Sequence, residues 1–65
     1  MKSYSSREVI ALLKYDGWYE AACDGSHHQF KHHLKSGKVT VKHPQKDIPI
    51  KTLKRIEAQS GIQFP

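Results

Sequence analysis

The sequence lacks cysteine pairs, long apolar runs and an apolar leader. Its single cysteine, Cys23, excludes an internal disulfide, and one thiolate alone does not build a metal site. The longest uninterrupted apolar run, Val9–Leu13, has five residues, whereas a membrane-spanning helix needs about 20. The first residues, Met1–Tyr4, contain no apolar stretch typical of a signal peptide. We therefore predict a cytoplasmic protein that makes no contact with a membrane.

The chain is short and basic. Its 65 residues predict one domain, residues 1–65, with a small core, because a domain of this size buries only about 60% of the surface that its unfolded chain exposes. There are 11 lysines and arginines against 6 acidic residues, which gives a net charge of +5. This charge favours a polyanionic partner, either nucleic acid or an acidic protein surface. The cations are spread along the chain rather than along one amphipathic helix, which disfavours a membrane surface.

The first part of the chain predicts a helix followed by three strands. The helix is expected over residues 5–16, where Ser5 and Glu8 match the capping-box pattern and apolar residues recur at helical spacing. Asp24 and Gly25 form the predicted hairpin turn between the first two strands. The three strands are predicted over residues 18–23, 27–34 and 39–42.

A second helix is predicted after the strands. Asp47 is the expected N-cap, Pro49 fits the first turn, and Gly61 ends the helix. The order α-β-β-β-α predicts an α+β fold with both helices on one face of a three-stranded antiparallel sheet and the other face open to solvent. The apolar stripe of this helix consists of Ile50, Leu53 and Ile56.

Four of the 5 histidines lie between residues 27 and 33, a density that raises the question of a metal site. In a strand, His28 and His32 would lie about 13 Å apart, too far for one ion. Neighbours such as His27 and His28 would point to opposite faces. A site completed by His43 would still need a carboxylate, and the predicted strands bring none near it. We therefore predict no metal site and no cofactor.

Strand alternation predicts a polar open face. Phe30 and Leu34 are expected to face the helices. A turn over residues 35–38 would place Lys31 opposite Lys42 in the third strand. Like charges that face each other across a strand pair are unfavourable unless an anion lies between them, and a phosphate backbone would be such an anion. The open face would then display His27, Gln29, Lys31, His33, Thr40 and Lys42.

Histidine and lysine on one face suit the cleavage of RNA through its own 2′-hydroxyl. That reaction needs a base for the hydroxyl, an acid for the departing 5′-oxygen and cations for the phosphorane. Histidine titrates near neutral pH and serves as either acid or base, while lysine stabilises charge on the phosphate. No metal is required for this route. The same residues also fit an ordinary solvated face of a basic protein, so the residues alone leave both interpretations open.

Four segments, in order, resemble the HicA toxins of HicA–HicB toxin–antitoxin systems over essentially the whole chain. One segment alone is a weak signal, but four at this spacing and chain length form a specific signature. Lys42 departs from the family pattern, because many relatives have proline at this position, and it adds a cation beside the His-Pro step. The matching segments are Leu13–Trp18, Gly25–Phe30, Val39–Pro44 and Ile50–Ile56, followed by Gly61-Ile62.

The resemblance implies a double-stranded-RNA-binding-domain-like fold and an mRNA interferase, an endoribonuclease that stops translation. In that family the histidine after Gly-Ser is catalytic, which corresponds to His27. The resemblance also implies a HicB-like antitoxin that masks this histidine and forms a hetero-oligomer with the toxin, which we expect to be monomeric when free. The further candidates for RNA binding or for support of the site are Gly25, Ser26, Lys31 and Lys42.

Two other functions fit parts of the sequence. The main alternative is a noncatalytic RNA-binding module of the same fold, which would read RNA by shape and phosphate contacts. The second is a protein that binds only an acidic protein partner. A helix-turn-helix DNA binder is disfavoured, because residues 18–42 are predicted as strands. The basic residues available to an RNA-binding module are Lys46, Lys51, Lys54 and Arg55.

Overall fold

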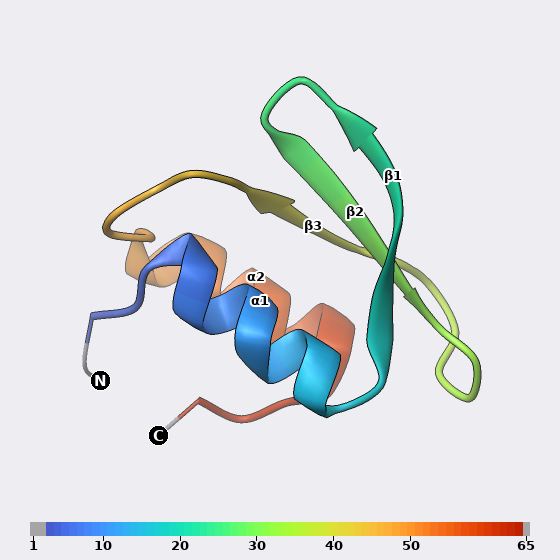
Figure 1. Ribbon diagram of the computed structural model, residues 1–65. Coiled ribbons are helices and arrows are strands. Elements are labelled where there is room, and N and C mark those ends of the chain that lie inside the picture. The colour runs from blue at the N-terminus through green and yellow to red at the C-terminus, as the bar shows by residue number, and fades with distance from the viewer. Residues whose placement is uncertain (1–2, 65) are drawn as a thin grey trace.

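The structure is a computed structural model and describes residues 3–64. Figure 1 shows two helices on the same side of a three-stranded sheet. This α-β-β-β-α arrangement confirms the predicted α+β fold. Met1, Lys2 and Pro65, which the predicted domain includes, lie outside the described residues. In chain order the elements are α1 (Ser6–Tyr15), β1 (Trp18–Asp24), β2 (His27–His32), β3 (Val39–Lys42) and α2 (Ile50–Ser60).

The predicted capping box begins α1. The Ser5 hydroxyl accepts a hydrogen bond from the Glu8 backbone N–H at 3.1 Å, and the Glu8 carboxylate accepts one from the Ser5 N–H at 2.9 Å. These bonds satisfy two donors that have no partner within the helix. The inner side of α1 buries Val9 and Leu13, and Asp16 forms its C-cap. The first helix is therefore confirmed within one residue at each end.

The strands form one antiparallel sheet in the order β1-β2-β3, so β2 is the central strand. Gly25 and Ser26 form the two-residue loop of the first hairpin, because Asp24 pairs with His27. This loop lies one residue later than the predicted Asp24-Gly25 turn. Gly25 has a φ of +62°, a backbone conformation that glycine adopts without a steric penalty.

The pairing of β2 with β3 differs from the predicted register by four residues. Lys42 pairs with His27, and Thr40 pairs with Gln29. Because directly paired side chains point to the same sheet face, this register decides which cation lies beside which histidine. The predicted partners, Lys31 for Lys42 and His33 for Thr40, are wrong.

The register differs because β2 ends early, at His32. Nδ1 of His32 accepts hydrogen bonds from the backbone N–H groups of Leu34, at 3.0 Å, and Lys35, at 3.2 Å. These two bonds turn the chain out of the strand and lengthen the loop before β3. Leu34 is 91% exposed as a result. The prediction that Leu34 faces the helices is therefore wrong.

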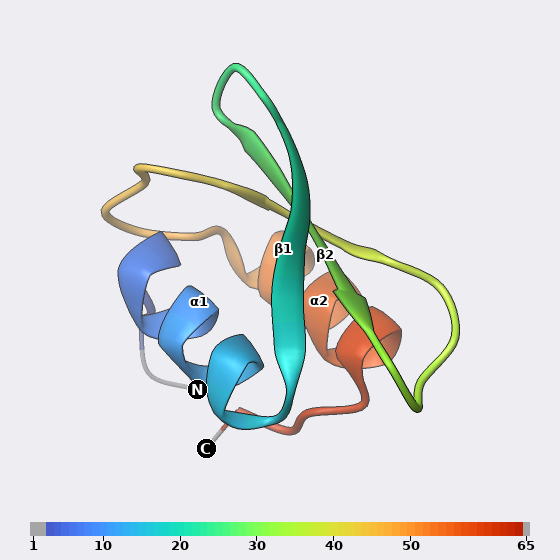
Figure 2. The same cartoon turned by 45° about the vertical axis from the view of Figure 1, so that its right-hand side comes forward.

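The core lies between the sheet and the two helices. α1 packs against β1 and β3, while α2 packs against β3. Figure 2 shows both helices on one side of the sheet, with the tip of the β1–β2 hairpin extending beyond them. The outer part of this hairpin is therefore not covered by either helix. The buried apolar side chains are Tyr4, Val9, Leu13, Trp18, Phe30, Val39, Val41, Ile48, Leu53, Ile56 and Phe64.

The start of α2 corrects another prediction. Pro49, and not Asp47, is the N-cap residue, and no side chain caps the helix. Ile48 donates a backbone hydrogen bond to the Tyr4 carbonyl at 2.9 Å. This contact holds the preceding segment against the chain that leads into α1, so the helix begins only after it.

The apolar stripe of α2 is confirmed in part. Leu53 and Ile56 are buried, but Ile50 is 54% exposed. The core position at this end of the helix is occupied by Ile48, which precedes the helix. Gly61 ends α2 in a left-handed conformation, as predicted. Within residues 3–64, neither helix is long and apolar enough to cross a bilayer.

A polar cluster joins the C-terminal end of α1 to the loop after β2 and to the end of α2. The Lys35 ammonium donates to the Asp16 carboxylate at 2.6 Å and to the Ser60 carbonyl at 3.0 Å. The same carboxylate accepts a hydrogen bond from the Trp18 indole at 3.2 Å. His32 donates from Nε2 to the Asp16 carbonyl at 2.7 Å, because its Nδ1 already accepts two backbone N–H groups. This cluster holds one end of the sheet against both helices.

We expect Gly17→Ala to destabilise the domain strongly. Gly17 has a φ of +101°, and a Cβ atom there would lie 2.8 Å from Nε2 of His32. The substitution would therefore add an overpacking penalty of about 1–3 kcal/mol to the strain of a left-handed conformation, about 1–2 kcal/mol. Gly37→Ala is the matched control, because Gly37 has a φ of +80° and a Cβ there meets no atom within 4 Å. Equal midpoints for the two variants in urea unfolding would contradict this account.

We expect Asp16 to make stability pH-dependent in acid. The hydrogen bond from Lys35 is the largest cause that lowers the pKa of the Asp16 carboxyl below 3.8. A lowered folded-state pKa stabilises the fold fully above the unfolded value, and this contribution is lost as the pH falls through the folded-state value. In urea unfolding, the advantage of the parent over Asp16→Asn should therefore shrink below about pH 4.

The control for this measurement is Asp47→Asn, which changes an exposed carboxylate outside the cluster. It should follow the parent over the whole pH range. An advantage over Asp16→Asn that is the same at pH 7 and pH 3 would show that Asp16 does not contribute through its charge.

Candidate functional site

His27 lies at the start of the central strand, on the sheet face opposite the helices. It is exposed and three residues from the buried Phe30, so strand alternation points it away from the core. It pairs with Asp24 of β1 on one side and with Lys42 of β3 on the other. Among residues 3–64, no side chain forms a hydrogen bond or ion pair with the His27 ring. The imidazole is therefore free to meet a ligand.

A pocket lies where β3 approaches α2, and it includes His27. Two cationic side chains also line it, Lys42 from β3 and Arg55 from α2. Among the described residues that line this pocket, none is acidic; Asp24 pairs with His27 but lies outside it. The remaining lining residues are Thr40, Gln45, Pro49 and Thr52.

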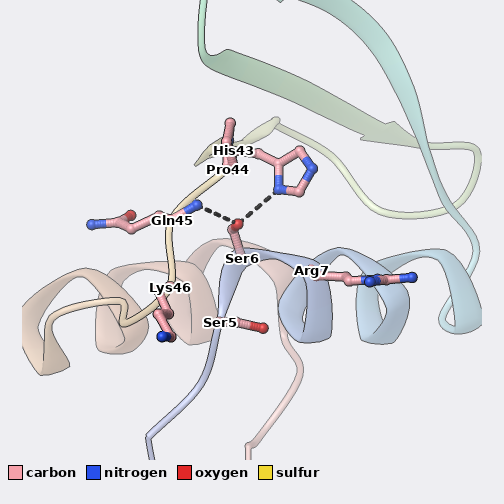
Figure 3. Close-up of a pocket in the computed structure, with 7 residues that line it drawn as sticks. All are labelled: Ser5, Ser6, Arg7, His43, Pro44, Gln45 and Lys46. Atoms are coloured by element: carbon pink, nitrogen blue, oxygen red, sulfur yellow. Dashed lines mark hydrogen bonds between the residues drawn. The ribbon is translucent and has the colours of Figure 1, made fainter.

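The segment after β3 is fixed by hydrogen bonds to α1 and to the hairpin loop. The His43 backbone N–H donates to the Ser26 carbonyl at 2.8 Å, and Nδ1 of its ring lies 2.7 Å from the Ser6 hydroxyl oxygen. That hydroxyl also accepts the Gln45 backbone N–H at 2.8 Å, and Figure 3 shows both contacts of the Ser6 side chain. These bonds hold Ser26, which precedes His27, and Gln45, which forms part of the wall of the pocket that includes His27.

The structure brings together only part of the predicted site. Lys31 is four residues from His27 along β2, which corresponds to about 13 Å in a strand. It pairs with Tyr19 of β1 and does not line the pocket. The predicted residues that do lie beside His27 are Gly25, Ser26 and Lys42.

His28 faces the helix side of the sheet, as alternation predicts. Its side chain is half-buried, and Nδ1 lies 3.0 Å from Oε1 of Glu20. Its ring also packs edge-on against the ring of His43, with centroids 5.3 Å apart. The adjacent histidines therefore occupy different environments on opposite faces of the sheet.

Gln45, Pro49 and Thr52 line the pocket but were not predicted as site residues. Arg55 was predicted only as one of the cations of the alternative RNA-binding module. Thr52 and Arg55 are three residues apart in α2, so helical spacing puts them on one side of the helix. That spacing is visible in the sequence, but the packing of this side of α2 toward β3 is not. Gln45 carries no local signal, because it lies in an irregular segment between β3 and α2.

The pocket has the chemistry of a phosphate-binding site with a proton-transfer group. Lysine presents a compact cation, and the arginine guanidinium matches the geometry of phosphate oxygens. Threonine hydroxyls and a glutamine amide add hydrogen-bond donors. Histidine exchanges protons near neutral pH. The arrangement therefore favours an anionic ligand and places one acid–base group beside it.

The fold and this pocket define a small α+β domain with a cationic site around one free histidine. A family model described as the HicA toxin of bacterial toxin–antitoxin systems matches residues 6–62. The chain therefore belongs to the HicA toxin family, as its sequence segments indicate. Membership implies the role of a toxin and, in general, an antitoxin partner. A search of curated proteins gave no match.

Proposed function

We propose that this toxin is an mRNA interferase, an endoribonuclease that acts in the cytoplasm and needs no metal ion for its reaction. The observation that supports this best is the pocket in which His27 meets Lys42 and Arg55. RNA supplies both the phosphate that this pocket suits and the 2′-hydroxyl on which a histidine acts. Lys31, at a distance along β2, contacts the RNA backbone away from the cleaved bond.

In the proposed reaction, the 2′-hydroxyl oxygen attacks the adjacent phosphorus. His27 takes the proton of that hydroxyl as a general base. The 2′-O–P bond forms as the P–5′-O bond breaks, and solvent water protonates the departing 5′-oxygen. Lys42 and Arg55 stabilise the negative charge that builds on the phosphate oxygens. The products are a 2′,3′-cyclic phosphate and a 5′-hydroxyl.

Gly25 and Ser26 support this site from the hairpin loop. The Ser26 carbonyl is held by the His43 backbone N–H, and the loop places His27 at the first position of the strand. No second histidine and no carboxylate lines the described pocket. Because the pocket offers a single histidine for proton transfer, we expect a modest enzyme rather than a fast one.

We propose that a HicB-like antitoxin inhibits the toxin by covering His27. The pocket has two cationic side chains and no acidic lining residue, so an acidic protein surface would complement it. The free toxin would be a monomer and the inhibited form a hetero-oligomer. The antitoxin would also stabilise this small domain by mass action, because it binds the folded state.

We expect His27→Ala to fold normally and to lose RNA cleavage. Removal of a general acid or base typically lowers the rate 10²- to 10⁴-fold. The assay incubates the purified protein with RNA in the presence of a chelator and identifies the ends of the products. His33→Ala is the matched control, because His33 is also exposed but stacks on Tyr19 instead of lining the pocket.

A gel-shift measurement beside this cleavage assay distinguishes the alternative, a noncatalytic RNA-binding module. In that case the parent would shift RNA in a gel without cutting it, and His27→Ala would bind equally well. If His27→Ala cleaved RNA as fast as the parent, the assignment of His27 would be wrong.

We expect Arg55→Gln to weaken RNA binding and to reduce its dependence on salt. Each phosphate contact on single-stranded nucleic acid contributes about 0.7 to the slope of log K against log salt concentration. The slope measured with Arg55→Gln should therefore be smaller by about that amount. Lys54→Gln is the control, because Lys54 precedes Arg55 in the same helix but does not line the pocket. Equal slopes for the two variants would remove Arg55 from the site.

A further inference from the structure

A second group of reactive side chains lies on the helix-side face of the outer hairpin. His28 donates from Nδ1 to the Glu20 carboxylate at 3.0 Å, because a carboxylate can only accept. The other ring nitrogen, Nε2, lies 3.8 Å from Sγ of Cys23. One ligand atom from each of the three residues lies within 4.8 Å of the others. Carboxylate, imidazole and thiol thus follow one another in a short chain of contacts.

A β-bulge is responsible for this grouping. Glu20 and Cys23 are three residues apart, so in a regular strand their side chains would point to opposite faces. In β1 the pairing shifts between Glu20 and Ala22, so that Cys23 pairs with His28 while Glu20 pairs with Phe30. The extra residue returns Cys23 to the face that carries Glu20 and His28. The thiol of Cys23 is therefore the group that a regular strand would not bring to this face.

We propose that Cys23 Sγ and His28 Nε2 bind one divalent transition-metal ion of the zinc type, with Glu20 as the residue that positions the imidazole. Zn–S and Zn–N bonds of about 2.3 and 2.0 Å at a tetrahedral angle separate the two ligand atoms by about 3.5 Å. The observed separation is 3.8 Å. The two atoms therefore need to move by only a few tenths of an ångström to share an ion.

The contact of Glu20 with Nδ1 gives the imidazole the form that a metal requires. A histidine that binds metal through one nitrogen commonly donates its other N–H to a carboxylate, which fixes the tautomer and makes the ligand more basic. Here Glu20 holds the proton on Nδ1, so the lone pair of Nε2 points to the side of the sulfur. Glu20 and Cys23 are both exposed, so an ion has access from solvent and water completes its coordination.

Thiolate and imidazole together select the class of metal. This combination suits zinc and its substitute cobalt rather than magnesium or calcium, which prefer oxygen ligands. Binding releases one proton from the Cys23 thiol to solvent; in the free protein this thiol donates to the Gly25 carbonyl at 3.3 Å. The ion would then link β1 and β2 next to the hairpin loop that precedes His27.

This site is separate from the proposed cleavage reaction. His28 and His27 point to opposite sheet faces, and none of the three residues lines the pocket of His27. The metal would therefore stiffen the hairpin without taking part in the chemistry. RNA cleavage in the presence of a chelator and metal binding are independent measurements, so one proposal can fail without the other.

The test adds Co²⁺ to the purified, reduced protein and follows the thiolate-to-cobalt charge-transfer absorption. We expect a band that saturates at one Co²⁺ per chain and disappears when Zn²⁺ displaces the cobalt. Cys23→Ser, a small change at an exposed position, should lose the band completely. Zn²⁺ should raise the melting temperature of the parent and should not raise that of Cys23→Ser.

Two further variants separate a ligand from a positioning residue. Glu20→Gln should keep the charge-transfer band at saturation but weaken metal binding about 10- to 100-fold, whereas His28→Gln should alter the band. His33→Ala is the matched control and should bind Co²⁺ like the parent, because His33 lies outside the cluster. Absence of a charge-transfer band in the parent, or an unchanged band in Cys23→Ser, would overturn the proposal.

Discussion

The alternation of side chains along β2 is the constraint on which the rest of the structure depends. β2 is the central strand, so each of its side chains faces either the core or the open side of the sheet. Phe30 is completely buried, and this fixes the direction of every other residue in the strand. His27 is thereby exposed on the open face, while His28 contacts Glu20 on the helix side. Two neighbouring histidines of the same chemistry thus acquire different partners solely through the pleat.

So small a sheet is held in place by polar contacts at both ends of α1 as well as by its apolar core. At the N-terminal end, the buried Ser6 hydroxyl contacts the segment after β3. At the C-terminal end, Asp16 joins Lys35 and the Trp18 indole. Each set includes a contact between residues far apart in sequence, Ser6 with His43 and Asp16 with Lys35, so these bonds position the loops that lie outside the apolar core. The pocket of His27 depends on the first set, because that segment carries part of its wall.

The features that could be predicted from the sequence are those with local physical causes. The capping box at Ser5 and the strand alternation around Phe30 depend on residues a few positions apart, and both are present. The bulge in β1 could not be predicted, because it depends on the pairing of β1 with β2. The β2–β3 register could not be predicted either, because the His32 ring is also held by a hydrogen bond to the Asp16 carbonyl, 16 residues away. The register depends on the backbone hydrogen bonds that His32 accepts after β2. The involvement of Arg55 in the pocket depends on how α2 packs against β3, which no short segment encodes.

The electrostatics of the pocket support the proposal that one surface serves two partners. Lys42 and Arg55 line the same pocket, where α2 packs against β3, and no acidic side chain in the described lining offsets their charge. An anion bound in this pocket would offset their charge, whether it is a phosphate of RNA or a carboxylate of a protein. The two ligands would then compete for the same cations, so an antitoxin needs no separate inhibitory mechanism. Occupation of the pocket by its acidic groups would exclude the RNA phosphate and cover the only imidazole that lines it.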